Sequence, residues 1–579
     1  MAGRWGFCGP TYTSQSPNID DEDAMNCYCE QSGSPNAKTP IALLHTPGRK
    51  VFAQLAGEAS IPGLFTVNGR TFAAASNLYE LTAGGAVINY GSLGVAPLTP
   101  TMMTANEKQL VILNNGNLYV LTFQGAITAA NIHAGAAGTG YAPGDTGTIN
   151  GTGSTYEVLT IGGGGSVATF AFTPGSGNVI SAGIATSVLT GAGDGAFEVD
   201  ISAVGNNVLY PVVMSQFNGP VAQIGFIDGY VIATLQNSHT FQQSNLEDAT
   251  VWNGLNIATL SYFPDNIISM VCNARTIQFS SGKKTVWYYN GGAGFPVFIP
   301  IQGAFYETGS CATYAILQVA ENRVFWLSQD ERGSLVAMLS NGFNGERIST
   351  HATELAWQQY AKSSDAVAWT YQEYGHTFIV VDFPSANASW AYDLTTGYWH
   401  KRGFWNAVNG TYIMDRAISH TLNFGIHLVG DWASGTVYQL SSLFSTDFGN
   451  AIRGYRRSPT LSKDNKWIYF NQLEIDAEVG IGVSAVDIAL WKAVYGAAPL
   501  TDGEGNPRPP QLMLRWSDDA GKTWSNTYML SVGSIGHYDK RVIKRMLGRG
   551  RKRLWEVSWT DPIPWRFADA YLEAEPQIA

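Results

Sequence analysis

The stretch NLYEL at residues 77–81 decides the fold, because the same pattern returns along the chain. It recurs as NLYVL at 117–121, a shift of 40 residues, and a third copy, TVYQL, lies at 436–440. Each copy follows a turn-forming segment, AAAS, LNNG or WASG. A repeat of about 40–50 residues is typical of a propeller blade with four short strands.

The surrounding sequence has the same character. In 376–402, HTFIVVDFPSANASWAYDLTTGYWHKR, apolar runs flank a polar turn, and a second turn precedes Trp399. Elsewhere, turn residues interrupt short apolar runs at the spacing of sandwiches, barrels or propellers. Only 351–362 and 483–495 carry a helical pattern.

Composition supports an all-β chain with a large core. Of the 579 residues, 45% are hydrophobic and only 14% charged, whereas about 25% are charged in an average soluble protein, so disorder is not expected. No uncharged run of 18 apolar residues exists, so no membrane span is expected. The first ten residues lack the apolar core of a signal peptide.

We predict a mainly β protein in four parts. These are an N-terminal arm (1–39), a β-propeller of about six to eight blades (40–135 and 208–445), an inserted Gly-rich β domain (136–207) and a C-terminal β-sandwich (446–579). The insert holds no Lys or Arg, and a flexible linker is the alternative interpretation. Regular alternation in 155–161 and 167–172 favours strands.

Charge is unevenly distributed along the chain. Residues 446–579 carry a net charge of +2, whereas the first 445 residues carry −13. Between Lys108 and Arg275 there is no Lys or Arg, while nine acids lie there. A nucleic-acid binder shows a basic footprint instead, so this acidic part should repel DNA phosphates.

The motifs for enzyme chemistry are weak, and we predict no catalytic residue, no cofactor and no metal site. The nine His are scattered, and no nucleophile elbow or P-loop is present. The five Cys are sparse and odd in number, which argues against a disulfide framework and fits a reducing cytosol. Cys27 and Cys29 lack a second ligand pair at zinc-finger spacing.

The sharpest local motif lies in the last domain and matches the Asp-box at every fixed position: Ser517, Asp519, Gly521, Thr523 and Trp524. We interpret it as a structural hairpin turn, in which the Asp accepts backbone hydrogen bonds and Gly adopts a positive φ. Sugar-binding propellers such as sialidases also carry this box, so a glycan-active enzyme is an alternative. The propeller portion lacks the Arg cluster that a sialidase needs.

A basic strip follows the Asp-box, with eight cations and no acid between residues 540 and 553. We interpret it as an interface with an acidic partner, such as a neighbouring copy; a phosphate-binding patch and a solvated sheet edge are the alternatives. The interface hypothesis covers Lys540, Arg541, Lys544, Arg545, Arg549, Arg551, Lys552 and Arg553, together with Arg456 and Arg457.

Three stretches in order carry a family resemblance: GFCGPTYTSQSPNIDDEDAMNCYCEQ (6–31), RGYRRSPTLSKDNKWIYFNQLEIDAEVG (453–480) and HYDKRVIKRMLGRGRKRLWEV (537–557). They resemble the packaged-DNA stabilisation proteins of short-tailed phages, also called tail accessory, hub or nozzle proteins. Cys29 stands where this family usually has Pro. The resemblance rests on roughly the first 50 and last 130 residues, and it gives the insert no place in the family.

The resemblance implies a non-enzymatic virion tail protein that is assembled in the host cytoplasm. Copies would form a homo-oligomeric ring, a hexamer, below the portal and the adaptor (head–tail connector) ring. The ring would retain packaged DNA together with a needle or plug, and would anchor tail spikes or fibres. Double-stranded DNA would pass through its lumen without sequence-specific binding. The remaining alternatives are a glycan-active spike enzyme and a glycan-binding module that uses the insert.

Overall fold

The structure is a computed structural model that describes residues 2–17, 19–34, 36–97, 99–123, 127–150, 152–174, 181–204, 207–260, 264–292, 296–330 and 333–576. Strands dominate these residues. Its α-helices are α1 (His351–Gln358) and α2 (Ala485–Tyr495), which confirms both helices predicted from the sequence. No helix in this part of the chain is long and apolar enough to cross a membrane.

Tight turns of Asn-Gly or Asp-Gly join many of the strands. Asn68-Gly69, Asn115-Gly116 and Asp228-Gly229 all adopt positive φ angles. Paired positive φ values are required by the two-residue hairpin turns that match the natural twist of strands. The turn residues therefore fix where each blade hairpin folds back.

Seven four-stranded antiparallel units surround a common axis as propeller blades. Their innermost strands contact one another in sequence, and the last contacts the first, so the ring is closed. Blades 1 to 4 are β7 (Gly63–Val67), β8 (Arg70–Ala74), β9 (Asn77–Leu81), β10 (Val87–Ser92); β11 (Met102–Ala105), β12 (Gln109–Asn114), β13 (Asn117–Thr122), β20 (Val208–Pro211); β21 (Val221–Ile227), β22 (Tyr230–Leu235), β23 (Thr240–Asn245), β24 (Asp248–Thr259); and β25 (Ser269–Asn273), β26 (Thr276–Ser280), β27 (Thr285–Asn290), β28 (Phe298–Tyr306). Blades 5 to 7 are β29 (Ile316–Gln318), β30 (Val324–Gln329), β31 (Leu335–Asn341), β32 (Asn344–Arg347); β33 (Val367–Glu373), β34 (His376–Phe383), β35 (Ala388–Asp393), β36 (Tyr398–Arg402); and β39 (Ala417–Asn423), β40 (Ile426–Asp431), β41 (Thr436–Ser441), β6 (Gly48–Gln54).

The sequence repeat marks the third strand of a blade. Its three copies are β9, β13 and β41, in blades 1, 2 and 7. The predicted propeller is therefore confirmed, with seven blades. Apolar clusters fill the spaces between successive blades; for example, Leu64 and Leu81 of blade 1 pack with Leu428 and Val437 of blade 7.

Blade 7 closes the ring with a strand from the other end of the sequence. β6 pairs antiparallel with β41, from Thr436 opposite Gln54 to Ser441 opposite Gly48. β6 and β41 are held together only by non-covalent contacts, so their backbone pairing and the side-chain contacts across it determine whether the propeller ring stays closed.

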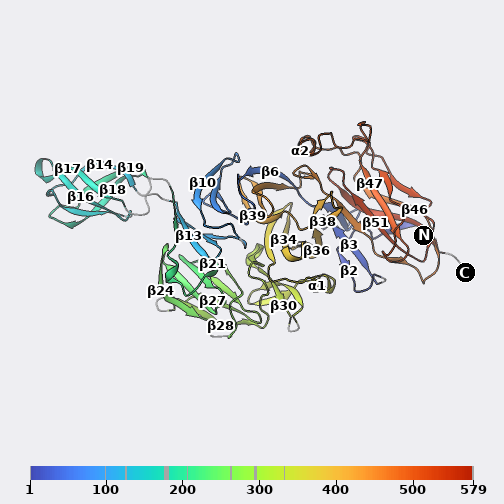
Figure 1. The fold of residues 1–579 in the computed structure, drawn as a ribbon, viewed down its shortest axis with the longest axis horizontal. Coiled ribbons are helices and arrows are strands. Elements are labelled where there is room, and N and C mark those ends of the chain that lie inside the picture. The colour runs from blue at the N-terminus through green and yellow to red at the C-terminus, as the bar shows by residue number, and fades with distance from the viewer. Residues whose placement is uncertain are drawn as a thin grey trace.

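The insert enters between the third and fourth strands of blade 2. It forms a six-stranded sheet of β14 (Ile127–Ala137), β15 (Thr146–Ile149), β16 (Ser154–Ile161), β17 (Val167–Thr173), β18 (Ser181–Thr190) and β19 (Phe197–Val204). The strands predicted at 155–161 and 167–172 are present, and the sheet starts at Ile127, before the predicted limit of residue 136. The insert lies at one end of the molecule, away from the propeller body (Figure 1).

The opposite end of the molecule is a sandwich of two sheets that pack through Phe470, Trp555 and Phe567. One sheet contains β1 (Ala2–Trp5), β4 (Cys27–Gln31), β5 (Ile41–His45), β46 (Ile468–Ala477), β49 (Val542–Arg545), β50 (Arg549–Gly550) and β52 (Arg566–Pro576). The other contains β2 (Tyr12–Thr13), β3 (Asp21–Met25), β44 (Gly454–Arg457), β45 (Leu461–Ser462), β47 (Gln511–Ser517), β48 (Tyr528–Ser531) and β51 (Lys552–Trp559), and it continues into blade 6. Short elements complete the described chain: β37 (Phe404–Asn406), β38 (Thr411–Ile413), β42 (Thr446–Asp447), β43 (Asn450–Ala451) and the 3₁₀ turns Gly163–Gly165, Met214–Gln216, Ala320–Asn322 and Pro384–Ala386.

The N-terminal segment, which we predicted as an arm over residues 1–39, contributes strands to the sandwich. β1 pairs with β52, and β3 lies between β36 of blade 6 and β44 of the sandwich. The alternation of apolar and polar residues in this short segment does not show which distant strands it pairs with. One continuous sheet therefore runs from the propeller through β3 into the sandwich.

Candidate functional site

A charged seam joins the two domains where β3 lies between β36 and β44. We define the seam as Asp21, Glu22 and Asp23 of β3 with Lys401, Arg456, Arg457 and Glu556. These residues include the two arginines of the Arg-Arg-Ser-Pro motif. One of the three stretches that carry the family resemblance, 453–480, is thus part of the connection between the domains.

Arg456 is completely buried in the seam. It donates hydrogen bonds to the carbonyls of Phe7 (2.8 Å) and Pro10 (2.9 Å) and forms an ion pair with Glu22. Burial raises the pKa of Glu22, and the charge of Arg456 opposes that rise. A Cβ added at Gly9 would lie 2.9 Å from a Glu22 oxygen and 3.0 Å from an Arg456 nitrogen, so a side chain at this position would push against the ion pair.

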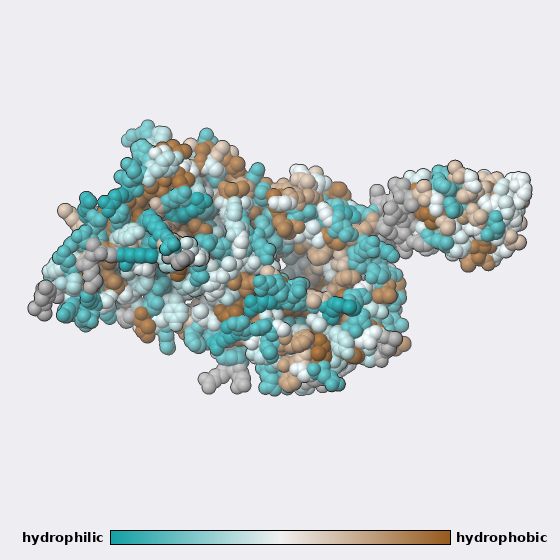
Figure 2. Space-filling view, turned by 180° about the vertical axis from the view of Figure 1, so that it is seen from behind, coloured by the Kyte–Doolittle hydropathy of each residue, from teal (hydrophilic) through white to brown (hydrophobic). Residues whose placement is uncertain are grey.

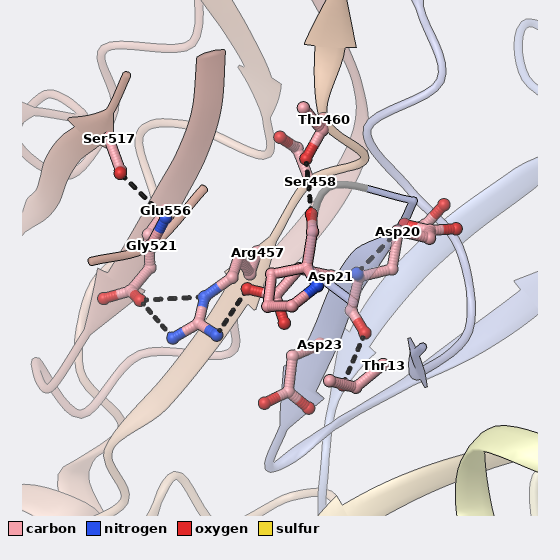
Figure 3. Close-up of polar contacts among 12 residues, drawn as sticks. Thr13, Asp20, Asp21, Asp23, Arg457, Ser458, Thr460, Ser517, Gly521 and Glu556 are labelled. Atoms are coloured by element: carbon pink, nitrogen blue, oxygen red, sulfur yellow. Dashed lines mark hydrogen bonds and ion pairs between the residues drawn. The ribbon is translucent and has the colours of Figure 1, made fainter. Parts of the chain in front are cut away.

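Arg457 lies beside Arg456 and connects β3 to β51. Its guanidinium donates to Asp21 and Glu556, each at 3.1 Å (Figure 3). The next acid, Asp23, accepts from Lys401 of blade 6 (3.0 Å) and from the Tyr455 hydroxyl (2.7 Å). Burial alone would raise the pKa of Asp23, but the nearby Lys401 and Arg457 charges outweigh it and lower that pKa. Buried charges paired in this way fix one register between β3 and its neighbours.

The Asp-box forms a hairpin turn after β47. Asp519 accepts from the Thr523 backbone N–H (2.8 Å) and hydroxyl (2.6 Å), and Ser517 accepts from the Gly521 N–H (2.8 Å). Gly521 has a φ of +86°, and these hydrogen bonds lower the pKa of Asp519 to about 2. The polar groups of the box bond to one another, which fits the structural interpretation.

The basic strip divides into buried and exposed cations. Three residues of the interface hypothesis are bonded within the chain: Arg456 and Arg457 bind acids of the seam, and Arg553, whose side chain is only 2% exposed, binds Asp518. Arg553 binds Asp518 (2.6 and 2.7 Å) and lies over the Phe470 ring. The sequence could not separate these residues, because the buried Arg553 directly follows the exposed Arg551 and the half-buried Lys552 in one basic run.

The other cations of the strip lie at or near the surface. Arg541 pairs with Glu474, Arg545 donates to Gln472, and Lys544 lies over the Tyr528 ring. Arg549 and Arg551 both lie over Trp467, with their guanidinium groups 4.7 and 5.0 Å from the ring. Lys540 is exposed and Lys552 half-buried. An interface through these seven residues remains a proposal.

A histidine cluster that the sequence did not single out ties the N-terminal segment to blade 6. His376 of β34 bonds to Asp393 of β35 through Nδ1 (2.7 Å) and to Glu30 of β4 through Nε2 (2.6 Å). The hydrogen bond to Asp393 raises the pKa of His376 to about 9, against the effect of burial, and Glu30 adds to the rise. Glu30 lies 346 residues from His376 in the sequence, so no local motif indicates the complete cluster.

We expect this cluster to make stability depend on pH. Because the folded pKa of His376 lies above the value of about 6.5 in the unfolded chain, its stabilisation is complete below pH 6.5 and is lost as the pH rises through 9. The free energy of unfolding of a His376→Gln variant should be about 3 kcal/mol lower than that of the wild type at pH 6 and should approach the wild-type value near pH 10. Urea unfolding across this range measures the difference, with exposed His351→Gln as control. A constant difference at every pH would contradict the assignment.

The described residues contain no group of three or more His, Cys, Asp or Glu that could hold a metal ion. The thiols of Cys27 and Cys29 are buried, and burial raises the pKa of Cys29 to about 12. A thiol so protonated is a poor nucleophile and a poor metal ligand.

The fold and the seam define a β protein in which a seven-bladed propeller, with a sheet inserted in blade 2, is joined to a sandwich. Two family models match it: bacteriophage P22 Gp10, beta-propeller, over residues 146–445, and bacteriophage P22 Gp10, beta-sandwich, over residues 455–575. The chain therefore belongs to the bacteriophage P22 Gp10 family of packaged-DNA stabilisation proteins, whose members are structural components of the virion tail. The resemblance in the sequence is confirmed, and the match extends through the middle of the chain.

Comparison with curated proteins gives no match. Among solved structures, the chain is similar to the N-terminal domain of Nup159, with 8% identity, a TM-score of 0.34, and 72% of this chain and 98% of that chain covered. The WD40 domain of Toxoplasma gondii coronin is 10% identical, with a TM-score of 0.30 and coverage of 76% and 85%. The SapL1 lectin in complex with alpha methyl fucoside is 12% identical, with a TM-score of 0.24 and coverage of 56% and 95%.

Proposed function

We propose that this protein is the subunit of a tail nozzle, a homo-oligomeric ring that extends the portal–adaptor channel of a short-tailed phage. The ring, a hexamer, retains packaged DNA with a needle or plug, conducts the DNA during ejection and anchors spikes or fibres. It acts as a passive conduit without catalysis. Family membership and the match to both domains support this role.

The observation that carries the conduit proposal is the charge distribution. The first 445 residues have a net charge of −13, and no Lys or Arg occurs between Lys108 and Arg275. A wall of acidic subunits repels phosphates, so DNA can slide through without adhering. Contacts outside the acidic wall that repels DNA must hold the subunits together, and the basic side of the sandwich offers such a contact between subunits.

A DNA-retention experiment tests the role. Particles assembled without this protein should package DNA and then lose it, so that nuclease digests most of the genome, and added protein should restore protection. Images of complete virions should show a ring with a central hole below the portal. Full DNA retention in particles that lack the protein contradicts the proposal.

The same preparation separates this role from the glycan alternatives. A nozzle subunit leaves host polysaccharide intact, whereas a spike enzyme releases oligosaccharides from it. The Asp-box does not favour an enzyme, because the carboxylate of Asp519 is engaged in its own turn.

A further inference from the structure

Helix α2 has an unusual distribution of polarity. Nine of its eleven residues are apolar, and the exceptions are Asp487 and Lys492. Asp487 is nevertheless the one buried residue of the helix, whereas Val486, Val494 and Tyr495 are each at least 40% exposed. A helix that is apolar on all sides is normally buried. Figure 2 shows apolar side chains gathered along the top of the sandwich half, where Figure 1 places α2.

The buried aspartate holds α2 firmly against the rest of the chain. Asp487 accepts from the Ser445 N–H (3.1 Å), the Thr446 hydroxyl (2.9 Å) and the Ser484 hydroxyl (2.7 Å). A Cβ added at Gly449 would lie 2.4 Å from the Leu490 carbonyl, so the helix rests directly on the chain there. α2 is thus a fixed knob whose outer face is apolar apart from the exposed Lys492. The turn that follows it carries Asp502 and Glu504, both exposed.

A recess of matching chemistry lies elsewhere on the sandwich. It has a volume of about 250 Å³ and is lined mainly by apolar groups: Trp5, Leu461, Ile468, Leu572 and Ala574. We call it the terminal recess, because β1 and β52 form much of its wall. Arg4, Ser462 and Lys463 lie at its rim.

The rim of the terminal recess is continuous with the exposed part of the basic strip. Ser462 pairs with Lys552 in the sheet, and Tyr469, next to Ile468, pairs with Arg549. Lys463 is exposed and forms no ion pair within the described chain. The recess therefore offers an apolar pocket beside unneutralised positive charge, whereas the turn after α2 offers exposed carboxylates.

The knob and the recess lie at different places on one molecule, because α2 contacts β42 and β43, whereas β1, β45, β46 and β52 line the recess. Ile468, at the recess, begins β46, and this strand ends at Ala477, shortly before α2. The ten residues of β46 span roughly 30 Å at about 3.3 Å per residue. α2 and the terminal recess are thus two separate, complementary surfaces of one copy. Such surfaces form a head-to-tail contact between copies, which closes into a ring when it is repeated by rotation.

We propose that α2 of one copy docks into the terminal recess of the next copy, with Glu504 and Asp502 facing the Lys463 rim. The occupant of the recess is thus a second copy of this chain. This inference rests on the proposed ring and names the contact that builds it. The helix supplies the apolar anchor, and the charge pairs set the orientation.

Substitutions on the outer face of α2 test the knob. Ala489 and Ala493 are exposed and one turn apart, and Glu is a good helix former, so Ala489→Glu/Ala493→Glu should keep the fold. Incorporation of the full-length variant into particles should fall at least roughly tenfold, which corresponds to about 1.4 kcal/mol of docking free energy. The matched control Ala489→Gln/Ala493→Gln adds length without charge and should be less impaired. Normal incorporation of the Glu variant, with an unchanged circular dichroism spectrum, overturns the proposal.

A charge exchange identifies the partner surface. Glu504→Lys and Lys463→Glu should each weaken incorporation, and the double variant should restore it, because each interface then holds the reversed pair. Only a contact between two copies of this chain permits such a rescue. Failure of the double variant to recover rejects the pairing of these two residues.

Cross-linking in assembled particles gives an independent readout. A Ser462→Cys/Ala493→Cys variant should form a ladder of disulfide-linked oligomers, whereas either single variant should yield no product above a dimer. A cross-link from residue 462 to a different tail protein shows another occupant and overturns the proposal. If wild-type virions contain no ring of this protein, the proposed function fails; if the ring is present but no ladder forms, only the knob-and-recess contact fails.

Discussion

Replacement of Arg49 by Met should open the propeller. Arg49 lies on β6, the strand that closes blade 7, and its side chain is 3% exposed. It donates to Asp447 through two nitrogens (2.7 and 2.8 Å) and to Asp415 (2.6 Å). Without the guanidinium, the buried Asp447 and the half-buried Asp415 both lose their ion pair. Breaking a buried pair in this way costs about 3–5 kcal/mol.

The loss of stability in Arg49→Met should be localised to the closing strand β6, and its size should depend on pH. Limited proteolysis should cut first between β6 and β7, because the closing strand is released. Burial already raises the pKa of Asp447, and removal of Arg49 raises it further, so the deficit should shrink as the pH falls towards about 4 and the carboxylates take up protons. Arg275→Met is the matched control: its side chain is 84% exposed, and it should lose at most about 1 kcal/mol. Equal stabilities of the two variants in urea would refute the closure role.

Replacement of Arg456 by Met should separate the N-terminal segment from the sandwich. The substitution leaves Glu22 and the carbonyls of Phe7 and Pro10 without their partner. We expect a loss of about 3–5 kcal/mol in the free energy of unfolding of the sandwich. Hydrogen exchange should increase in residues 4–17 before it increases in the propeller.

A double-mutant cycle separates the ion pair from general packing. If Glu22 is the group left uncompensated, Glu22→Gln/Arg456→Met should be no less stable than Arg456→Met alone. Arg551→Met, an exposed arginine of the basic strip, should change stability by less than about 0.5 kcal/mol. A double variant that shows the full sum of both single losses would mean that the two side chains act independently.

The sequence predicted the fold where the signal is local and periodic. The 40-residue repeat indicated blades because each copy occupies the same strand position, and the turn residues marked the hairpins. The partners of β3 and β6 could not be predicted, since both strands pair with segments more than 370 residues away. Short alternating runs specify a strand but not its neighbour.

The site was predictable in composition but not in geometry. The eight cations in 540–553 predicted a basic surface. Arg553 is nevertheless buried, because the aromatic rings of Phe470 and Trp516 and the carboxylate of Asp518 lie around it. The sequence indicated the seam only through a family motif, because its acids and bases come from four separate stretches of the chain. Helix α2 was expected, but its exposed apolar face depends on the burial of Asp487, which the helical pattern alone does not show.

The position of β52 has a consequence for synthesis on the ribosome. This last strand pairs with β1, β5 and β46 at the centre of its sheet, and Leu572 and Ala574 form part of the terminal recess. During synthesis, α2 therefore emerges before the terminal recess is complete. β1 lacks its partner strand until residue 576 has emerged. Such long-range pairing makes folding slow. In the proposed ring, a translation product that stops before β52 would carry the knob without its receptor, so it could end a row of subunits but could not extend it.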